Sequence, residues 1–171
     1  TTSAPSSRTK SAFEALADFA PLAGRGQQTT VAHKGGHFTL IDESYNANPL
    51  SMKAGFTSLG QHPVQGQGRR VVVLSDMLEL GEHSRALHEG LVEPLVLNRI
   101  DLVHLAGPQM RQLYDILPPR LRGEWRETAA ELASIAGQLV APEDIVMVKG
   151  SNGSKAALVA KALAELNSTA E

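Results

Sequence analysis

The sequence has no cysteine, and this absence excludes several kinds of site at once. None of the 171 residues is Cys, so disulfide frameworks, thiolate zinc sites and cysteine nucleophiles are ruled out. A chain without thiols is typical of a reducing compartment. We therefore expect a cytoplasmic protein.

An excess of one charge and long apolar runs are also lacking. Sixteen Lys and Arg stand against 18 Asp and Glu, which gives a formal charge of −2. Such a chain has no field of one sign to attract phosphate backbones or anionic membranes, so neither nucleic acid nor a membrane is an expected partner. No uncharged apolar run reaches the roughly 18 residues of a membrane span, and no basic segment followed by an apolar one opens the chain.

The composition that remains is that of a globular domain. Hydrophobic residues make up 42% and charged residues 20% of the chain, which is close to the globular average. Residues 1–10, rich in Ser, Thr and Pro, predict a disordered tail or linker, and residues 11–171 predict one domain. That domain is expected to begin with a helix from Ser11, with Glu14 completing a capping box, that ends before Pro21.

The pattern after this helix predicts an α/β fold. Residues 29–33 and 37–42 flank Lys34-Gly35-Gly36, as in an antiparallel β-hairpin. Helices are then expected at 49–60, 84–98 (disturbed near Pro94), 108–117, 128–140 and 154–166, alternating with strands at 71–74, 102–105, 124–126 and 145–148. This alternation predicts βαβ crossovers and a doubly wound, mostly parallel sheet that follows an N-terminal β-hairpin.

Polar segments follow three of the predicted strands, where open α/β sheets bind their ligands. These segments are DESYNANP at 42–49, SDMLE at 75–79 and KGSNGS at 149–154. Acids, amides, a cation and small residues with free N–H groups would thus share one edge of the sheet. Such an edge suits a polar, partly anionic ligand.

Each of these residues also has a purely structural interpretation. Asn48 before Pro49 can simply begin a helix, and Asp76 can cap the segment that follows it. Tyr45 can pack its ring and hydrate its hydroxyl. Lys149 can be a solvated lysine, although a cation followed by small residues at a helix N-terminus favours the binding of carboxylate or phosphate.

Other candidate sites are not supported. His83 and His88 are five residues apart, so they do not share a helical face as zinc ligands at i and i+4 do, and we expect solvated or capping histidines. We propose no metal site within the chain. The sequence contains neither G-x-x-x-x-G-K-[ST] nor G-x-G-x-x-G, and therefore has no phosphate-binding loop of its own.

Residues 40–52, LIDESYNANPLSM, resemble a signature of the Mur ligase family. The pattern D-[DE]-S-Y-N-A-N-P-x-S-M is similar to that of the members that add D-alanyl-D-alanine to UDP-N-acetylmuramoyl-tripeptide. Residues 75–82, SDMLELGE, resemble the G-D-M-L-E-L-G-E of these members, with Ser75 in place of Gly. Residues 148–151 resemble their V-K-G-S, with Asn152 where Arg is common.

The resemblance extends over most of the chain and implies one domain of a larger enzyme. Residues 24–26, Gly-Arg-Gly, resemble the start of the third domain of the family, and the motifs run in order from about Phe13 to Leu166. Family members have an N-terminal domain for the UDP-sugar, a central ATPase domain with a P-loop, and a Rossmann-like C-terminal domain. Only the last corresponds to this chain, so the resemblance implies that the chain alone is inactive.

The resemblance implies ATP-dependent amide formation in peptidoglycan synthesis. By analogy, Arg25 would meet the ATP phosphates, Asp42 and Glu43 the ribose hydroxyls, and Asn46 and Asn48 the nucleotide or substrate. ATP and Mg²⁺ would be held mostly by the central domain. The other Mur ligase domains, ATP, D-alanyl-D-alanine and UDP-N-acetylmuramoyl-tripeptide are the implied partners.

A second set of residues is implied to bind substrate. Lys149, Gly150 and Ser151 would help to bind D-alanyl-D-alanine, Tyr45 would line the same site, and Asp76 would lie near the dipeptide amine. No residue of the chain is expected to be catalytic. Positioning and the exclusion of water on domain closure are the expected contributions.

Two other functions stay open at this point. The chain could be a stand-alone nucleotide-binding module. It could also be a phosphoacceptor receiver domain, which needs an acidic pair, an Asp and a Lys at three strand ends, a set that Asp42, Glu43, Asp76 and Lys149 supply. The hairpin before the acidic pair and the long interval between Asp76 and Lys149 count against the receiver domain.

Overall fold

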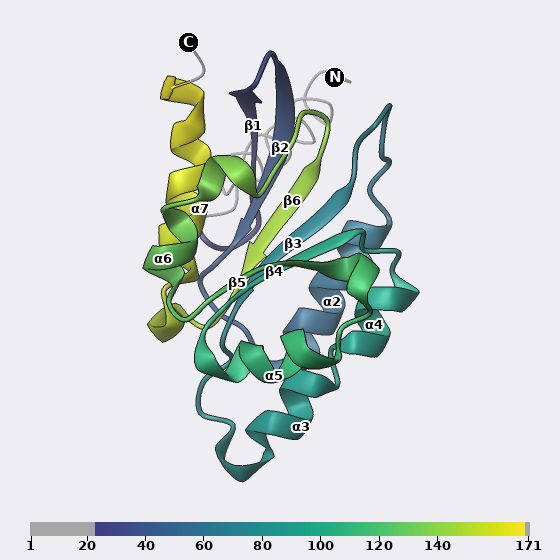
Figure 1. Ribbon diagram of the computed structural model, residues 1–171, viewed down its shortest axis with the longest axis vertical. Coiled ribbons are helices and arrows are strands. Elements are labelled where there is room, and N and C mark those ends of the chain that lie inside the picture. Colours follow the sequence, from purple (N-terminus) through teal and green to yellow (C-terminus); the bar gives the residue numbers. More distant parts are fainter. Residues whose placement is uncertain (1–22, 170–171) are drawn as a thin grey trace, which may run out of the picture.

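The computed structural model describes residues 23–169 as one six-stranded sheet with helices on both faces (Figure 1). The tail expected at residues 1–10 and the helix expected from Ser11 lie outside the described residues. The strands are β1 (Gln27–His33), β2 (Gly36–Glu43), β3 (Arg70–Ser75), β4 (Leu102–Ala106), β5 (Arg122–Arg126) and β6 (Ile145–Lys149). Their order in the sheet is β1-β2-β6-β3-β4-β5.

The strand pairing confirms the predicted fold class. β1 pairs with β2 antiparallel, and every other neighbouring pair is parallel. The hairpin turns at Lys34 and Gly35, whose φ angles of 50° and 82° are both positive. A two-residue hairpin loop of the primed type requires such angles at both positions. The parallel strands end together at one edge, which carries all three predicted polar segments.

The helices form two layers, which are visible on opposite sides of the sheet in Figure 1. One layer contains α2 (Pro49–Gly60), α3 (Ser84–Glu89), α4 (Val92–Leu97) and α5 (Pro108–Ile116), and the other contains α6 (Ala129–Ala133) and α7 (Ala156–Ala164). Side chains of β3 alternate between them: Val72 and Leu74 pack in the first core, and Val71 and Val73 in the second. This explains the wholly apolar run in β3, because a strand covered on both faces has no polar side.

Three expected helices are clearly shorter than predicted. The helix expected at 84–98 is divided at Gly90 and Leu91 into α3 and α4. Pro94 is the third residue of α4, within the first turn, where its missing N–H removes no helical hydrogen bond.

The helix expected at 128–140 was also wrong in its length. α6 stops at Ala133, and a short 3₁₀ turn, η3 (Ala136–Gln138), follows it. Ser134 donates its hydroxyl to the Glu131 carbonyl at 2.6 Å, a local bond that competes with helix continuation. Ile135 then leaves helical geometry, with φ −115° and ψ 25°.

The last helix is shorter than expected at both ends. α7 covers Ala156–Ala164, between the 3₁₀ turns η4 (Asn152–Ser154) and η5 (Glu165–Thr169). Lys155 separates η4 from α7 with a left-handed backbone at φ 64°. We expected the Lys149-Gly150-Ser151 segment to lie at the N-terminus of an α-helix. This was wrong, because η4 and Lys155 separate it from α7.

Candidate functional site

A cleft of about 350 Å³ lies at the carboxyl ends of β2 and β6. It is lined by Gly24, Arg25, Glu43, Tyr45, Asn46, Ser51 and Lys149. Five of the predicted site residues, drawn from three separate segments of the chain, thus surround one β2–β6 cleft. Its position is the one that open α/β sheets use for ligands.

Lys149 is a buried cation in this cleft. It is the last residue of β6, stands opposite Glu43 of β2 in the sheet register, and is 5% exposed. Its Nζ donates a hydrogen bond to the Asn46 carbonyl oxygen at 3.1 Å. Burial lowers the pKa of Lys149, and the charge of Glu43 opposes this shift. An ammonium group has three donors, so Lys149 can bind a carboxylate while it keeps its bond to Asn46.

Arg25 and Tyr45 form a stacked pair on the rim of the same cleft. The Arg25 guanidinium carbon lies 3.8 Å from the centroid of the Tyr45 ring, within the range of a cation–π contact. The Tyr45 N–H donates to the Gly24 carbonyl at 2.8 Å, and the Gly26 N–H donates to the Asp42 carbonyl at 2.7 Å. These backbone bonds fix the Gly-Arg-Gly segment beside the end of β2.

Asp42 and Asn48 are engaged within the fold. Asp42 Oδ1 accepts hydrogen bonds from Ser44 N at 3.0 Å and from Ser44 Oγ at 2.5 Å, and Asp42 lines a separate hollow of about 140 Å³. Asn48 caps α2: its Oδ1 accepts from Ser51 N at 2.8 Å, while Ser51 Oγ accepts from Asn48 N at 3.0 Å. The Asn48 side chain thus begins a helix, which is the structural interpretation given for it above.

Asp76 lies apart from the β2–β6 cleft, in a second cavity of about 260 Å³ at the ends of β3 and β4. Its buried carboxylate accepts hydrogen bonds from Gln109 N at 3.2 Å and Met110 N at 2.9 Å. It therefore caps α5 rather than the segment that directly follows it. Burial raises the pKa of Asp76, and the bonds from Gln109 and Met110 oppose this shift.

A chain of serine hydroxyls joins the three polar segments. Ser154 Oγ donates to the Ser151 carbonyl at 2.8 Å, so the proton between Ser75 Oγ and Ser154 Oγ, 2.6 Å apart, belongs to Ser75. Ser151 Oγ accepts from Leu78 N at 2.9 Å and donates to the Ala47 carbonyl at 3.3 Å. The loops after β2, β3 and β6 therefore form one hydrogen-bonded unit.

This arrangement assigns Ser151 and Gly150 to the support of the cleft. Both residues are buried and neither lines the β2–β6 cleft. The Ser151 hydroxyl is used by Leu78 and Ala47, and a side chain at Gly150 would overlap the Ser75 hydroxyl.

His88 belongs to the same unit and was missed by sequence reasoning. We expected a solvated or capping histidine, but His88 is fully buried. Its Nε2 lies 3.0 Å from Met77 N, which donates to it. The available signal was its helical spacing to Leu91 and Leu95, both fully buried, which places it on an apolar face.

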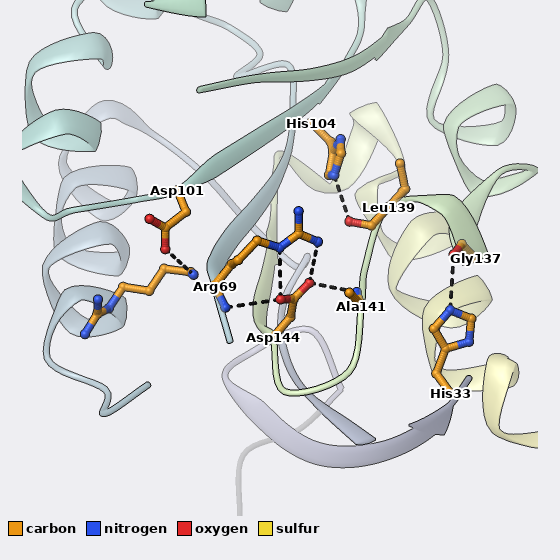
Figure 2. Close-up of polar contacts among 9 residues, drawn as sticks. His33, Arg69, Asp101, His104, Gly137, Leu139, Ala141 and Asp144 are labelled. Carbon is orange, nitrogen blue, oxygen red and sulfur yellow. Dashed lines mark hydrogen bonds and ion pairs between the residues drawn. The ribbon is translucent and has the colours of Figure 1, made fainter. Parts of the chain in front are cut away.

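A second polar group that the sequence did not reveal anchors the other end of β6, and Figure 2 shows its contacts. Asp144, directly before β6, forms an ion pair with Arg69 at 2.8 Å and accepts from Ala141 N at 2.7 Å. His104 Nε2 lies 2.8 Å from the Leu139 carbonyl. Burial lowers the pKa of His104 to about 4. These contacts hold the segment before β6, and hence the strand that carries Lys149.

Two features were not found in the described part of the chain. Among residues 23–169, no helix combines the length and apolar character needed to cross a membrane. The same residues contain no group of three His, Asp or Glu side chains placed to hold a metal ion.

The family and the relatives that match this chain are all Mur ligases. The family model of the Mur ligase glutamate ligase domain matches residues 24–152. The UDP-N-acetylmuramoyl-tripeptide--D-alanyl-D-alanine ligase of Rickettsia prowazekii is 32% identical over 140 residues, covering 82% of this chain and 30% of the relative. The Escherichia coli ligase of the same name is 34% identical over 128 residues, covering 74% and 27%.

Solved structures share the fold. MurF from Acinetobacter baumannii superposes with a TM-score of 0.66 at 26% identity, covering 84% of this chain and 30% of that one. MurF ligase from Thermotoga maritima in complex with ADP gives a TM-score of 0.69 at 24% identity, covering 88% and 32%. The chain thus spans about 30% of the length of the relatives that it matches.

Proposed function

The chain belongs to the Mur ligase family, and on that premise we propose that it is the C-terminal domain of an ATP-dependent ligase. The ligase would add D-alanyl-D-alanine to UDP-N-acetylmuramoyl-tripeptide in the cytoplasm, during the synthesis of peptidoglycan precursors. The names of the Rickettsia prowazekii and Escherichia coli relatives support this substrate assignment. Because the chain spans about 30% of those relatives, the complete reaction requires the other Mur ligase domains.

The observation that carries this proposal is the composition of the β2–β6 cleft. Arg25, Glu43, Tyr45, Asn46 and Lys149 converge there from three segments, and each segment resembles a Mur ligase motif. The cleft offers two cations, a carboxylate, an amide and an aromatic ring. Such a set suits substrates that carry phosphate, ribose and carboxylate groups.

The proposed reaction joins two substrates through an activated carboxylate. An oxygen of the tripeptide carboxylate bonds to the γ-phosphorus of ATP, the bond to ADP breaks, and an acyl phosphate forms. The dipeptide amine then attacks the acyl carbon, phosphate leaves, and the amine nitrogen loses a proton. This chain contributes positioning, which lowers the entropic barrier to both steps.

Within the cleft, we assign Lys149 to the dipeptide carboxylate, because a desolvated cation forms a strong charge-assisted hydrogen bond. Arg25 is assigned to the ATP phosphates, as its planar guanidinium suits two oxygens at once. Glu43 is assigned to the ribose hydroxyls, and Tyr45 and Asn46 to contacts with the bound substrates. These roles rest on the cleft geometry and on the family resemblance.

The residues outside the cleft receive other roles. Asp42 faces the neighbouring hollow and can offer its second carboxylate oxygen to the ribose. Asn48, Gly150 and Ser151 keep the loops in place through contacts inside the fold. Asp76 caps α5 beside a different cavity, so its expected place near the dipeptide amine remains a prediction.

The site for magnesium is expected in the other domains of the ligase. The described residues lack a group of three side chains that could hold the ion, so we propose that any Mg²⁺ bound with ATP is held by the other domains.

The full chain alone provides a test of this proposal. We expect chemical-shift changes of Lys149 and Asn46 on titration with D-alanyl-D-alanine, and ATP binding in the millimolar range or weaker, because one edge of a composite site makes only part of the contacts. We expect no release of ADP, since the sequence has no P-loop to hold the phosphates. Micromolar ATP binding without any response to the dipeptide would favour a stand-alone nucleotide-binding module.

The receiver-domain alternative receives no support from the geometry. Asp76 and Lys149 line different cavities, whereas a phosphoacceptor site needs its acids and its lysine around one phosphoryl group.

A further inference from the structure

His88 has hydrogen-bond partners on both sides of its ring, and Nδ1 also lies 3.3 Å from Ser84 Oγ. The Met77 N–H donates to Nε2 at 3.0 Å, and Nδ1 lies 2.7 Å from the Ser84 carbonyl oxygen. A backbone N–H can only donate and a carbonyl can only accept. Nε2 of His88 therefore accepts with a lone pair, and Nδ1 carries the proton that is donated to Ser84.

Nε2 of His88 accepts a hydrogen bond from the segment 76–78, in which all three residues are hydrogen-bonded to other parts of the fold. The Asp76 carboxylate accepts from the first turn of α5, through Gln109 N and Met110 N. Met77 N donates to His88 of α3, and Leu78 N donates to Ser151 Oγ. Residues 76–78 are thus attached to α5, to α3 and to the loop after β6.

These contacts continue into the β2–β6 cleft. Ser151 accepts from Leu78 and donates to the Ala47 carbonyl. The residue before Ala47 is Asn46, whose carbonyl accepts from Lys149. A continuous path of hydrogen bonds and adjacent residues therefore links the buried imidazole of α3 with the cation at the end of β6.

We propose that His88 is a positioning residue for the dipeptide site. Its Nε2 lone pair holds Met77, and through Leu78, Ser151 and Ala47 it keeps Asn46 and Lys149 in the geometry that binds a carboxylate. This role rests on the proposed function of the β2–β6 cleft. His88 itself lines neither the β2–β6 cleft nor the cavity beside Asp76, so it acts only through the backbone of the loop.

Two amide variants separate this role from simple packing. In His88→Gln, the side-chain oxygen reaches about as far as Nε2 and can still accept from Met77 N. In His88→Asn, the shorter side chain reaches only the Nδ1 position, so Met77 N loses its acceptor. Both variants place an uncharged amide at the same buried position, which makes them a matched pair.

The first measurement uses the full chain and needs no ligand. In His88→Asn, hydrogen exchange of the Met77 amide should be about tenfold faster than in the parent, as expected for the loss of one buried hydrogen bond. In His88→Gln it should remain within about threefold of the parent. The Val72 and Val146 amides of the central strands serve as the control. After correction for the free energy of unfolding measured in urea, their exchange should be equal in the two variants. Equal exchange of Met77 in both would overturn the proposed bond.

The second measurement uses a ligase that contains this chain together with the other Mur ligase domains. We expect His88→Asn to raise the KM for D-alanyl-D-alanine about fivefold or more, with His88→Gln and the KM for ATP within about twofold of the parent. If Asn raises the dipeptide KM no more than Gln, the positioning role is wrong. The proposed function itself fails if D-alanyl-D-alanine causes no chemical-shift change in the parent chain and the parent ligase does not ligate it. This outcome does not depend on the hydrogen exchange of Met77.

Should His88→Asn fail to fold, His88→Gln alone still decides the question. A Gln variant that folds, protects the Met77 amide and yet loses dipeptide affinity would contradict the proposal. A Gln variant that retains both would support it.

Discussion

Lys149 and Asn46 are joined by a hydrogen bond of 3.1 Å from the lysine ammonium to the asparagine carbonyl. The bond crosses from the end of β6 to the loop after β2, so Lys149 is held by the loop that carries Tyr45 and directly follows Glu43. A buried lysine costs folding free energy unless it is paired. Glu43 already supplies one negative charge, and the proposed carboxylate ligand would supply a second.

The nucleotide and the dipeptide should respond to different substitutions. Glu43→Gln, in a ligase with all domains, should raise the KM for ATP by about tenfold, because a hydrogen bond to a charged group is worth about 1.5 to 3 kcal/mol. The KM for D-alanyl-D-alanine should rise by less, since Glu43 is assigned to the ribose and acts on Lys149 only through its charge. Steady-state kinetics with each substrate varied in turn would check this. An unchanged ATP constant would remove Glu43 from the nucleotide site.

Ser75 and Gly150 should be energetically coupled. A side chain at Gly150 would overlap the Ser75 hydroxyl, so Gly150→Ala should destabilise the parent by about 1 to 3 kcal/mol. In the Ser75→Gly background the cost of Gly150→Ala should be smaller by at least about 1 kcal/mol. Urea unfolding of the two single variants and the double variant measures this coupling. Additive costs would show that the two residues do not constrain each other.

His104 should make the fold sensitive to mild acid. Its neutral ring accepts from Glu124 N at Nδ1, at 3.0 Å, and donates to the Leu139 carbonyl from Nε2. Its pKa is about 4 in the fold, against about 6.5 in the unfolded chain. The unfolded chain thus binds the proton more readily, so this stabilisation is complete above pH 6.5 and is lost as the pH falls toward 4.

Urea unfolding at pH 7 and at pH 4.5 measures that loss. Between these values His104 should account for a decrease of about 2 kcal/mol in the free energy of unfolding, which His104→Gln should lack. The exposed His83, replaced by Gln, serves as the control and should keep the parent behaviour. If His104→Gln showed the same acid loss as the parent, another group would have to be responsible.

Features set by neighbouring residues were predictable from the sequence. The turn at Lys34 and Gly35 and the start of α2 at Pro49 depend on local backbone preferences, and the structure confirms both. The apolar run of β3 indicated a central strand because burial on both faces leaves no polar position. The convergence of Glu43, Asn46 and Lys149 on one cleft followed from parallel strands ending at one edge, whereas the place of Arg25 was implied only by the motif resemblance.

Features set by distant residues were not predictable in this way. Asp76 caps a helix that begins more than thirty residues later, and no local pattern indicates which N–H groups a carboxylate will reach. His104 is buried between Leu139 and Glu124, and the Nε2 partner of His88 is the Met77 N–H of a separate loop; the spacing of His88 to Leu91 and Leu95 indicates that it is buried but not which group it bonds. The early end of α6 is a local feature that was also missed: Ser134 bonds to Glu131, which helical spacing alone does not reveal.

The most direct test of the proposed site is the effect of Lys149→Met on the KM for D-alanyl-D-alanine, measured in a ligase that contains this chain and the other Mur ligase domains. Methionine roughly retains the volume and removes the charge. The exposed Lys161, replaced by Met, controls for the loss of a positive charge. Leu132→Ala, which should cost about 2 to 5 kcal/mol of stability, controls for destabilisation without a change in the cleft.

The proposed site predicts that Lys149→Met raises the dipeptide KM by about tenfold or more and leaves the KM for ATP within about twofold, because one charge-assisted hydrogen bond to the carboxylate is lost. Both controls should leave the dipeptide KM unchanged in the folded fraction. A dipeptide KM within about twofold of the parent in Lys149→Met would contradict the assignment and leave Lys149 as a structural lysine bonded to Asn46.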